Sequence, residues 1–182
     1  MDNDDSRGTF VEDLLLTSAF LVKGVVEGKT QRLSRVLEHG VNPFLSVRNA
    51  LKIDLQRGDR ARFPQLLVGM DQLVLAHEYV DFSRDDFYRS GGDRDQAMIQ
   101  ALVTGPVALT LTGYAARRDL ETSFENRHFM VMERPRIELN PPCPEVSGEI
   151  LADLPYVIIN RARISCFYGV TPEGAEDQSP PR

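Results

Sequence analysis

Four arginines in the second half of the 182-residue chain have a spacing that could bind an anion. Arg134 and Arg136 alternate in one apolar segment, and Arg161 and Arg163 alternate in another. Alternate residues of a β-strand share a face of the sheet, so two neighbouring strands would bring the four guanidinium groups together. Guanidinium groups bind phosphates and carboxylates through paired hydrogen bonds. The sequence therefore offers one candidate ligand-binding site.

The same arginines have a simpler interpretation as ion-paired surface residues. Glu133 and Glu138 lie in the segment that carries Arg134 and Arg136. Opposite charges on facing strand positions attract one another, and such pairs contribute to sheet stability. The sequence favours ion pairs over ligand binding, and both interpretations stay open at this point.

No other reactive residues have the spacing of a catalytic or metal site. His39, His77 and His128 are far apart in sequence, whereas metal ligands usually share an element at a fixed spacing. Cys143 has no neighbouring histidine, and the chain contains no nucleophile motif or glycine-rich phosphate loop. The sequence thus predicts a non-enzymatic protein without catalytic residues, metal or cofactor. Cys166 is expected to be a small buried apolar residue, and a bridge to Cys143 is left open.

The overall composition restricts the class of partner. The net charge is -6, and acidic and basic residues are spread over both halves. Binding to a phosphate backbone needs clustered cations, so the sequence argues against general nucleic-acid binding. The N-terminus lacks the pattern of a signal peptide, and no apolar run approaches the ~18 residues of a membrane span. We therefore expect cytoplasmic residence and no membrane insertion.

The elements that would position these residues belong to a sequence pattern that occurs twice in the chain. The stretch PQLLVGMDQLVLAH at 64–77 is followed 91 residues later by PYVIINRARISCFY at 155–168. Both contain a proline, one variable residue, three branched aliphatics, four turn-like or charged positions and a second apolar run. A repeat of this length indicates that one small unit occurs twice.

Three further elements recur in the same order, at offsets of 85 to 89 residues. The first is a strand that contains Gly24 in one copy and Gly113 in the other. The second is a short helix, and the third is a strand with an expected kink near Asn49 and Ala50 in the first copy. The corresponding segments are 20–26 and 107–115, 31–40 and 119–126, and 44–55 and 129–139.

The repeat predicts a mainly β protein made of two tandem small β-barrels, each with a short helical turn. Residues 10–19 fit either a short helix or the beginning of a strand. The expected organisation is a flexible tail at 1–9, a first small β-barrel at 10–80, a linker at 81–97, a second small β-barrel at 98–170 and a disordered tail at 171–182.

Two motifs in the first copy resemble known small barrels. The aliphatic triplet at 66–68, Gly69 and the following strand resemble the second signature of Sm-like barrels, which have an SH3-like architecture. The string G-x-V…R-L-S-x-x-L…F-L-x-V-x-x-A, from Gly24 to Ala50, resembles a bacterial family of small barrels with no assigned function. The Arg-Gly pair that Sm proteins use near RNA is replaced by Val68-Gly69, so the resemblance does not extend to RNA binding.

These observations lead to two functional hypotheses. The first is a non-enzymatic assembly or adaptor module, because open barrels expose strand edges that invite pairing with a protein partner or with a second copy. The alternative is a sensor or adaptor that binds a phosphate-bearing ligand, such as a nucleotide or RNA, through the second barrel. The residues of that alternative site are Arg134, Arg136, Arg161 and Arg163.

Overall fold

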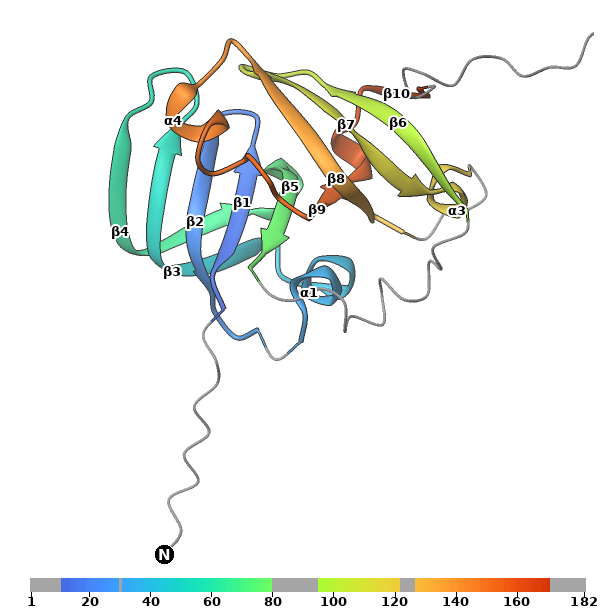
Figure 1. The fold of residues 1–182 in the computed structure, drawn as a ribbon. Helices are drawn as coiled ribbons and strands as arrows, with labels where there is room; N and C mark the ends of the chain where they lie inside the picture. Colours follow the sequence, from blue (N-terminus) through green and yellow to red (C-terminus); the bar gives the residue numbers. More distant parts are fainter. Residues whose placement is uncertain (1–10, 30, 80–94, 122–126, 171–182) are drawn as a thin grey trace, which may run out of the picture.

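The computed structural model describes residues 11–29, 31–79, 95–121 and 127–170 (Figure 1). The two expected tails and most of the expected linker at 81–97 lie outside these residues. Gln96 and Ala97, the last two linker residues, already belong to a strand.

The described residues of the first half form five strands, one α-helix and one turn of 3₁₀ helix. In chain order these are β1 (Asp13–Thr17), β2 (Phe20–Val26), α1 (Leu33–His39), β3 (Phe44–Asp54), β4 (Arg60–Gly69), η1 (Met70–Gln72) and β5 (Leu73–Glu78).

Five strands also lie within the described residues of the second half. Its elements are β6 (Gln96–Val103), β7 (Ala108–Ala116), α3 (Arg117–Leu120), β8 (Phe129–Asn140), α4 (Pro144–Ser147), β9 (Tyr156–Asn160), η3 (Arg161–Arg163) and β10 (Cys166–Gly169). None of the described helices is long and apolar enough to cross a membrane.

All ten described strands form one antiparallel sheet in the order β10-β6-β7-β8-β9-β5-β1-β2-β3-β4. The second half contributes the order β10-β6-β7-β8-β9, and the first half contributes β5-β1-β2-β3-β4. In each half the last strand of the chain segment lies beside the first one, so the two halves have the same strand order. Figure 1 shows β5 and β9 between the two groups of strands. The mainly β prediction is confirmed, but the sheet is open and the expected pair of barrels is not confirmed. The physical reason is that β9 occupies the edge of β5 on which β4 could close.

The predicted local elements agree with the structure in most places. The helix expected at 31–40 is α1, and the ambiguous stretch at 10–19 contains β1. The repeated stretches are each two strands separated by a 3₁₀ turn. The helix expected at 119–126 begins earlier, as α3, and residues 122–126 lie outside the described chain.

A glycine at the same place in each half lets two strands approach closely. The register between β2 and β3 shifts at Gly24, and the register between β7 and β8 shifts at Gly113. A Cβ atom on Gly24 would lie 2.7 Å from the Arg48 carbonyl oxygen, and one on Gly113 would lie 2.7 Å from the Glu133 carbonyl oxygen. A side chain would therefore force the strands apart at these bulges.

The residue that follows each of these carbonyl groups has a left-handed backbone. Asn49 has a φ of 51° and Arg134 has a φ of 46°. The kink expected near residues 49 and 50 is thus confirmed, and it recurs in the second half one residue before Pro135.

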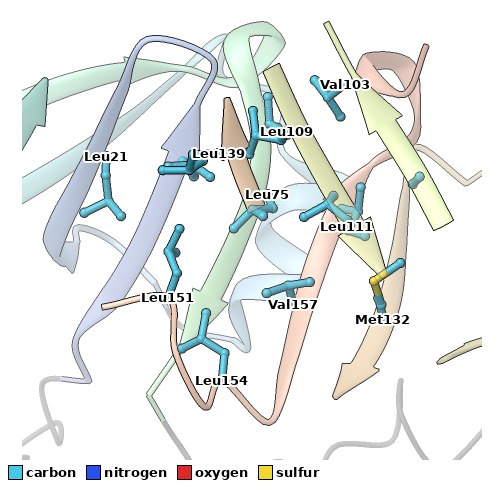
Figure 2. Close-up of a cluster of buried hydrophobic side chains, with 14 of the residues drawn as sticks. Leu21, Leu75, Val103, Leu109, Leu111, Met132, Leu139, Leu151, Leu154 and Val157 are labelled. Carbon is cyan, nitrogen blue, oxygen red and sulfur yellow. The ribbon is translucent and has the colours of Figure 1, made fainter. Parts of the chain in front are cut away.

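The core consists of two clusters, and each contains side chains from both halves. One cluster contains Leu14, Leu75 and Ile159, and the other contains Leu15, Ala76 and Ile158. Figure 2 shows Leu75 of the first cluster together with Val157 and Leu139 from the second half. Because neighbouring residues of a strand point to opposite faces, the clusters lie on opposite faces of the sheet at the place where β5 meets β9. The apolar core is therefore continuous between the halves.

We predict that Gly24→Ala destabilises the fold by about 1–3 kcal/mol, because the added methyl group overpacks the bulge. Equilibrium unfolding in urea measures this change. Gly148→Ala is the matched control, since a Cβ there would meet only the Pro144 carbonyl oxygen, at 3.6 Å. Equal stability of the two variants would contradict the close-approach explanation.

Candidate functional site

The two halves join where β5 pairs with β9. The paired residues are Leu75 with Ile159 and Ala76 with Ile158, and all four side chains are buried. The pairing and burial in this short ladder can be compared with those of the outer strands β4 and β10.

Polar contacts at one end of this junction involve Tyr156. Its hydroxyl group donates a hydrogen bond to the Glu78 carbonyl oxygen at 2.9 Å. The Tyr156 carbonyl oxygen lies 2.9 Å from Nδ1 of His77, and a carbonyl only accepts, so Nδ1 carries the hydrogen. The His77 ring lies 4.8 Å from the Tyr79 ring and 4.6 Å from the Tyr156 ring, measured between centroids. Burial lowers the pKa of His77.

A second polar contact joins α1 to β8. The Glu38 carboxylate accepts hydrogen bonds from the backbone N–H groups of His128, at 3.0 Å, and Phe129, at 3.1 Å. The Phe129 side chain is only 3% exposed and belongs to the same apolar cluster as Leu37 and Ala76. The second half thus docks on the helix of the first half as well as on its edge strand.

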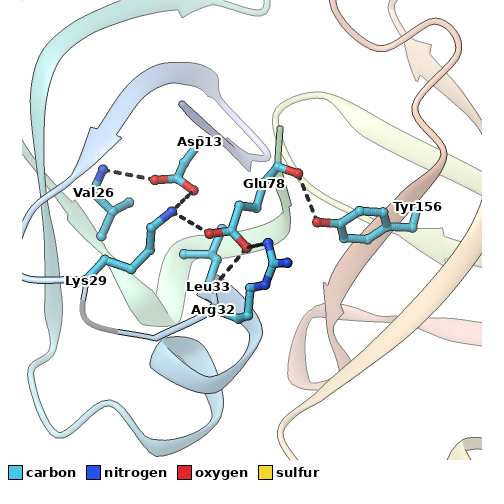
Figure 3. A network of polar contacts seen from close by, with 7 residues as sticks. All are labelled: Asp13, Val26, Lys29, Arg32, Leu33, Glu78 and Tyr156. Carbon is cyan, nitrogen blue, oxygen red and sulfur yellow. Dashed lines mark hydrogen bonds and ion pairs between the residues drawn. The ribbon is translucent and has the colours of Figure 1, made fainter. Parts of the chain in front are cut away.

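Glu78 connects the junction to a buried ionic network (Figure 3). The Lys29 Nζ atom lies 2.7 Å from Asp13 Oδ1 and 2.6 Å from Glu78 Oε1. Asp13 also accepts the Val26 N–H at 3.0 Å, and Arg32 lies 3.6 Å from Glu78. Burial raises the pKa of Asp13, which the hydrogen bond from Lys29 opposes. These contacts hold the loop after β2 against β1 and β5, so we interpret the network as structural.

The outer strands β4 and β10 are the two ends of the ladder and have one neighbouring strand each. Every residue of β10 is exposed, whereas every residue of β5, its counterpart in the strand order, is buried. Most of β4 is exposed, whereas all of β9, its counterpart, is buried. β5 and β9 pair with each other and pack into the two core clusters, whereas β4 and β10 have no second neighbour in the described sheet.

The edge formed by β4 is protected over only part of its length. Its first half carries the exposed residues Arg60 and Arg62 and ends at Pro64, which has no N–H to donate. Charged residues and proline are the usual protection of an edge strand against pairing. The second half carries Leu66, Leu67 and the buried Val68, and the Leu67 side chain is 60% exposed.

The edge formed by β10 carries Phe167, which is 42% exposed, and the half-exposed Tyr168. The Tyr168 hydroxyl group contacts the Gln100 side chain on β6. Cys166 is also exposed, so the prediction of a buried Cys166 was wrong, and neither it nor the buried Cys143 is in a disulfide. The apolar segments at 66–68 on β4 and 166–168 on β10 are therefore candidate binding surfaces. Comparing the sequences of the two copies did not identify them.

The four candidate arginines do not converge on one place. Arg161 and Arg163 lie on η3 and not on a strand, and the Arg161 N–H bonds to the His128 carbonyl oxygen at 2.9 Å. Arg134 lies six residues after His128, which corresponds to roughly 20 Å of extended chain. Although β8 and β9 are neighbours, their register separates the two pairs of arginines.

The surroundings of the exposed pair are those of surface arginines. Arg134 lies over the Tyr114 ring at 5.5 Å, and the Arg136 Nε atom lies 2.9 Å from Glu138. The ion pair with Glu138 joins residues of one strand and is not the expected cross-strand pair. Glu133 accepts a hydrogen bond from Gln96 at 2.6 Å.

A third arginine environment surrounds the buried Asp119. Arg118 and Arg127 both lie 3.8 Å from its carboxylate. Burial raises the pKa of Asp119, and the positive charges of Arg127, Arg118 and Arg161 oppose that shift. A carboxylate at the centre neutralises part of the positive charge, so this cluster is explained by ion pairing.

The histidines do not share a site. His39 and His128 are exposed, whereas His77 is buried at the junction. Within 11–29, 31–79, 95–121 and 127–170, no three His, Cys, Asp or Glu side chains are grouped so that they could hold a metal ion. The chain matches no family model, no curated protein and no solved structure.

We predict that Lys29→Met destabilises the protein by about 3–5 kcal/mol, because it removes the cation that the buried carboxylates of Asp13 and Glu78 share. Lys23→Met is the control, since Lys23 forms a half-exposed pair with Glu12 at 3.0 Å and its loss should change stability by less than about 1 kcal/mol. Urea unfolding of both variants measures the difference. A small effect of Lys29→Met would show that the network contributes little.

We predict that acidification weakens the protein through His77. The folded-state pKa lies below the ordinary value of about 6.5, so the unfolded chain binds a proton first as the pH falls. The contribution is complete above about pH 6.5 and decreases as the pH falls toward the folded-state pKa. Urea unfolding between about pH 7 and about pH 5 should show a smaller loss for His77→Gln than for the unsubstituted protein. Parallel curves for the two proteins would rule out this role of His77.

Proposed function

We propose that the protein is a non-enzymatic assembly module that binds a protein partner through the second half of β4 and through β10. The observation that carries this proposal is the difference in burial between equivalent strands. β5 and β9 are buried and pair with each other, while β10 and β4 are exposed and keep the same type of edge open. Strand addition at an open edge combines backbone hydrogen bonds with side-chain contacts.

The proposal includes the origin of the two halves. We propose that each is a copy of one small barrel unit of Sm-like or SH3-like type, opened by the pairing of the copies. The shared strand order, the bulges at Gly24 and Gly113 and the left-handed residues Asn49 and Arg134 support this relation. The offset of 85 residues between Asn49 and Arg134 agrees with the repeat in the sequence.

The side chains on the two edges suit a protein partner. Leu67 and Phe167 are large, apolar and exposed on strands that have no outer neighbour in the described sheet. Burying one such side chain contributes roughly 2 kcal/mol. Long unprotected edges are usually avoided. The apolar segment of β4 is short and lies next to a protected segment, and β10 has only four residues, so both edges favour controlled pairing over general aggregation.

The alternative of a phosphate-bearing ligand has less support. It required Arg134, Arg136, Arg161 and Arg163 to act together, and their positions on β8 and η3 separate them. We therefore place the partner at the edges and not at the arginines.

We predict that Leu67→Lys and Phe167→Lys each remove the partner and leave the fold intact, because both side chains are exposed and a charged residue at an edge opposes strand pairing. Native mass spectrometry of the protein purified gently from its own cells reports what remains bound. Ala61→Lys is the matched control, since it is exposed on the protected half of β4.

The expected result is a complex that survives Ala61→Lys and is lost in both edge variants. A complex that survives all three substitutions would contradict the proposal. A monomer that carries a nucleotide or RNA would return attention to the arginines of the second half.

A further inference from the structure

We infer that the partner at these edges is a second copy of the same chain, joined head to tail, with β4 of one copy paired to β10 of the next. The inference rests on the proposed edge-binding function and names its partner. Its basis is the junction that the chain already contains between β9 and β5.

The strand pairings establish which residues of the two halves are equivalent. Phe44 pairs with Gly69 in the first half, and Phe129 pairs with Asn160 in the second. The positions on β4 and β9 therefore differ by 91 residues.

The same comparison relates the other two strands. Asp13 lies opposite Gly24 and Ile99 lies opposite Gly113, so Leu15 and Ala101, each two residues further on, are equivalent. Leu15 pairs with Ala76 in the first half, and Ala101 pairs with Phe167 in the second. The positions on β5 and β10 also differ by 91 residues. Each open edge is thus the counterpart of a strand that is paired inside the chain.

Transferring the internal register to two copies gives a specific pairing. The pair formed by Ala76 and Ile158 becomes Phe167 of one copy opposite Leu67 of the next. The pair formed by Leu75 and Ile159 becomes Cys166 opposite Val68. The register therefore places the exposed aliphatic side chain of one edge directly against the exposed aromatic side chain of the other.

The surface beside β4 supports the same arrangement. Phe44 is 55% exposed, whereas its counterpart Phe129 is 3% exposed. Phe129 and Ile158 are buried together in the cluster that contains Ala76. A head-to-tail contact would cover Phe44 and Leu67 in the way that the internal junction covers Phe129 and Ile158.

The lengths of the two edges also agree. The strand β9 begins after Pro155 and pairs with β5 at Ile158 and Ile159, and the corresponding Pro64 on β4 precedes the apolar segment. Arg60 and Arg62 lie before this proline, on the part of β4 that the template leaves unpaired. Five residues from 65 to 69 then remain for pairing with the four residues of β10.

The two edges are different surfaces, so this contact is heterologous. Each copy offers one β4 and one β10, and repeated pairing either closes a ring or continues as a filament. A two-fold dimer formed by two β4 strands or two β10 strands would not follow from the internal template.

Disulfide cross-linking of the purified protein tests the register. Leu67→Cys and Phe167→Cys are prepared separately on a Cys166→Ser background, which removes the exposed native thiol beside the probe. Opposite residues of an antiparallel pair have Cβ atoms about 4.5–5.5 Å apart, which is close to what a disulfide requires. Mixing the two proteins under oxidation should give a covalent dimer that contains one of each.

Arg62→Cys mixed with Phe167→Cys is the matched control. Arg62 is exposed on the same strand but lies five residues from Leu67, roughly 17 Å along the chain. This mixture should show little of the mixed dimer. Cross-linking that is equal in both mixtures, or that yields only Leu67→Cys or only Phe167→Cys homodimers, would overturn the inferred register.

A chain that carries both Leu67→Cys and Phe167→Cys extends the test to the whole assembly. Under non-reducing conditions it should form a ladder of multiples of 20.5 kDa, which stops at one size for a ring and continues for a filament. Light scattering of the unsubstituted protein provides a second measurement. A single monomeric mass at every concentration, together with absent cross-linking, would overturn self-assembly.

These results separate the inference from the proposed function. If cross-linking fails but Leu67→Lys and Phe167→Lys still release a different protein from the native complex, the edges bind a partner other than this chain. The function as an edge-binding module would then stand, and the head-to-tail contact would fall. If the edge variants also release nothing, both fail.

Discussion

The pairing of β5 with β9 is the contact on which the rest of the architecture depends. It occupies the edge on which the first half could close, and it makes ten described strands into one open ladder with β4 and β10 at the ends. The same contact places Phe129 and Ile158 in one core cluster with residues of the first half. The two halves therefore gain stability from each other, and each leaves one edge open.

The buried ionic network stabilises β5, the strand of the first half that forms this contact. Lys29 bridges Asp13 on β1 and Glu78 on β5, and Glu78 accepts the Tyr156 hydroxyl hydrogen bond through its backbone. Burying charges is unfavourable unless they are paired, so the network requires one arrangement of the β2 loop and the two strands. It thus helps to keep β5 in the position that β9 needs. His77 lies on the same strand, and burial lowers its pKa.

Local patterns in the sequence predicted most strands and the helix α1, because periodicity and glycine positions depend on nearby residues. They did not predict which strands pair between the halves, since that depends on burial over the whole molecule. Cys166 shows the limit: its alignment with the buried Leu75 suggested burial, yet β10 lacks the outer neighbour that β5 has. Arg161 and Arg163 were assigned to a strand, but the chain forms a 3₁₀ turn there. Nothing in the sequence identified Glu38, Glu78 or Tyr156 as junction residues, because their partners are 78 to 91 residues away.

Amide hydrogen exchange at the two edges tests the central claim most directly, because it reports backbone pairing without any substitution. The internal strands β5 and β9 serve as the reference for paired backbone. Alternate amides at 65–69 and 166–169 already face β3 or β6. The account predicts that the remaining, outward-facing amides exchange quickly in dilute protein and become protected, toward the level of β5 and β9, as the concentration rises. Fast exchange of both edges at every concentration, and also in the complex isolated from cells, would contradict it.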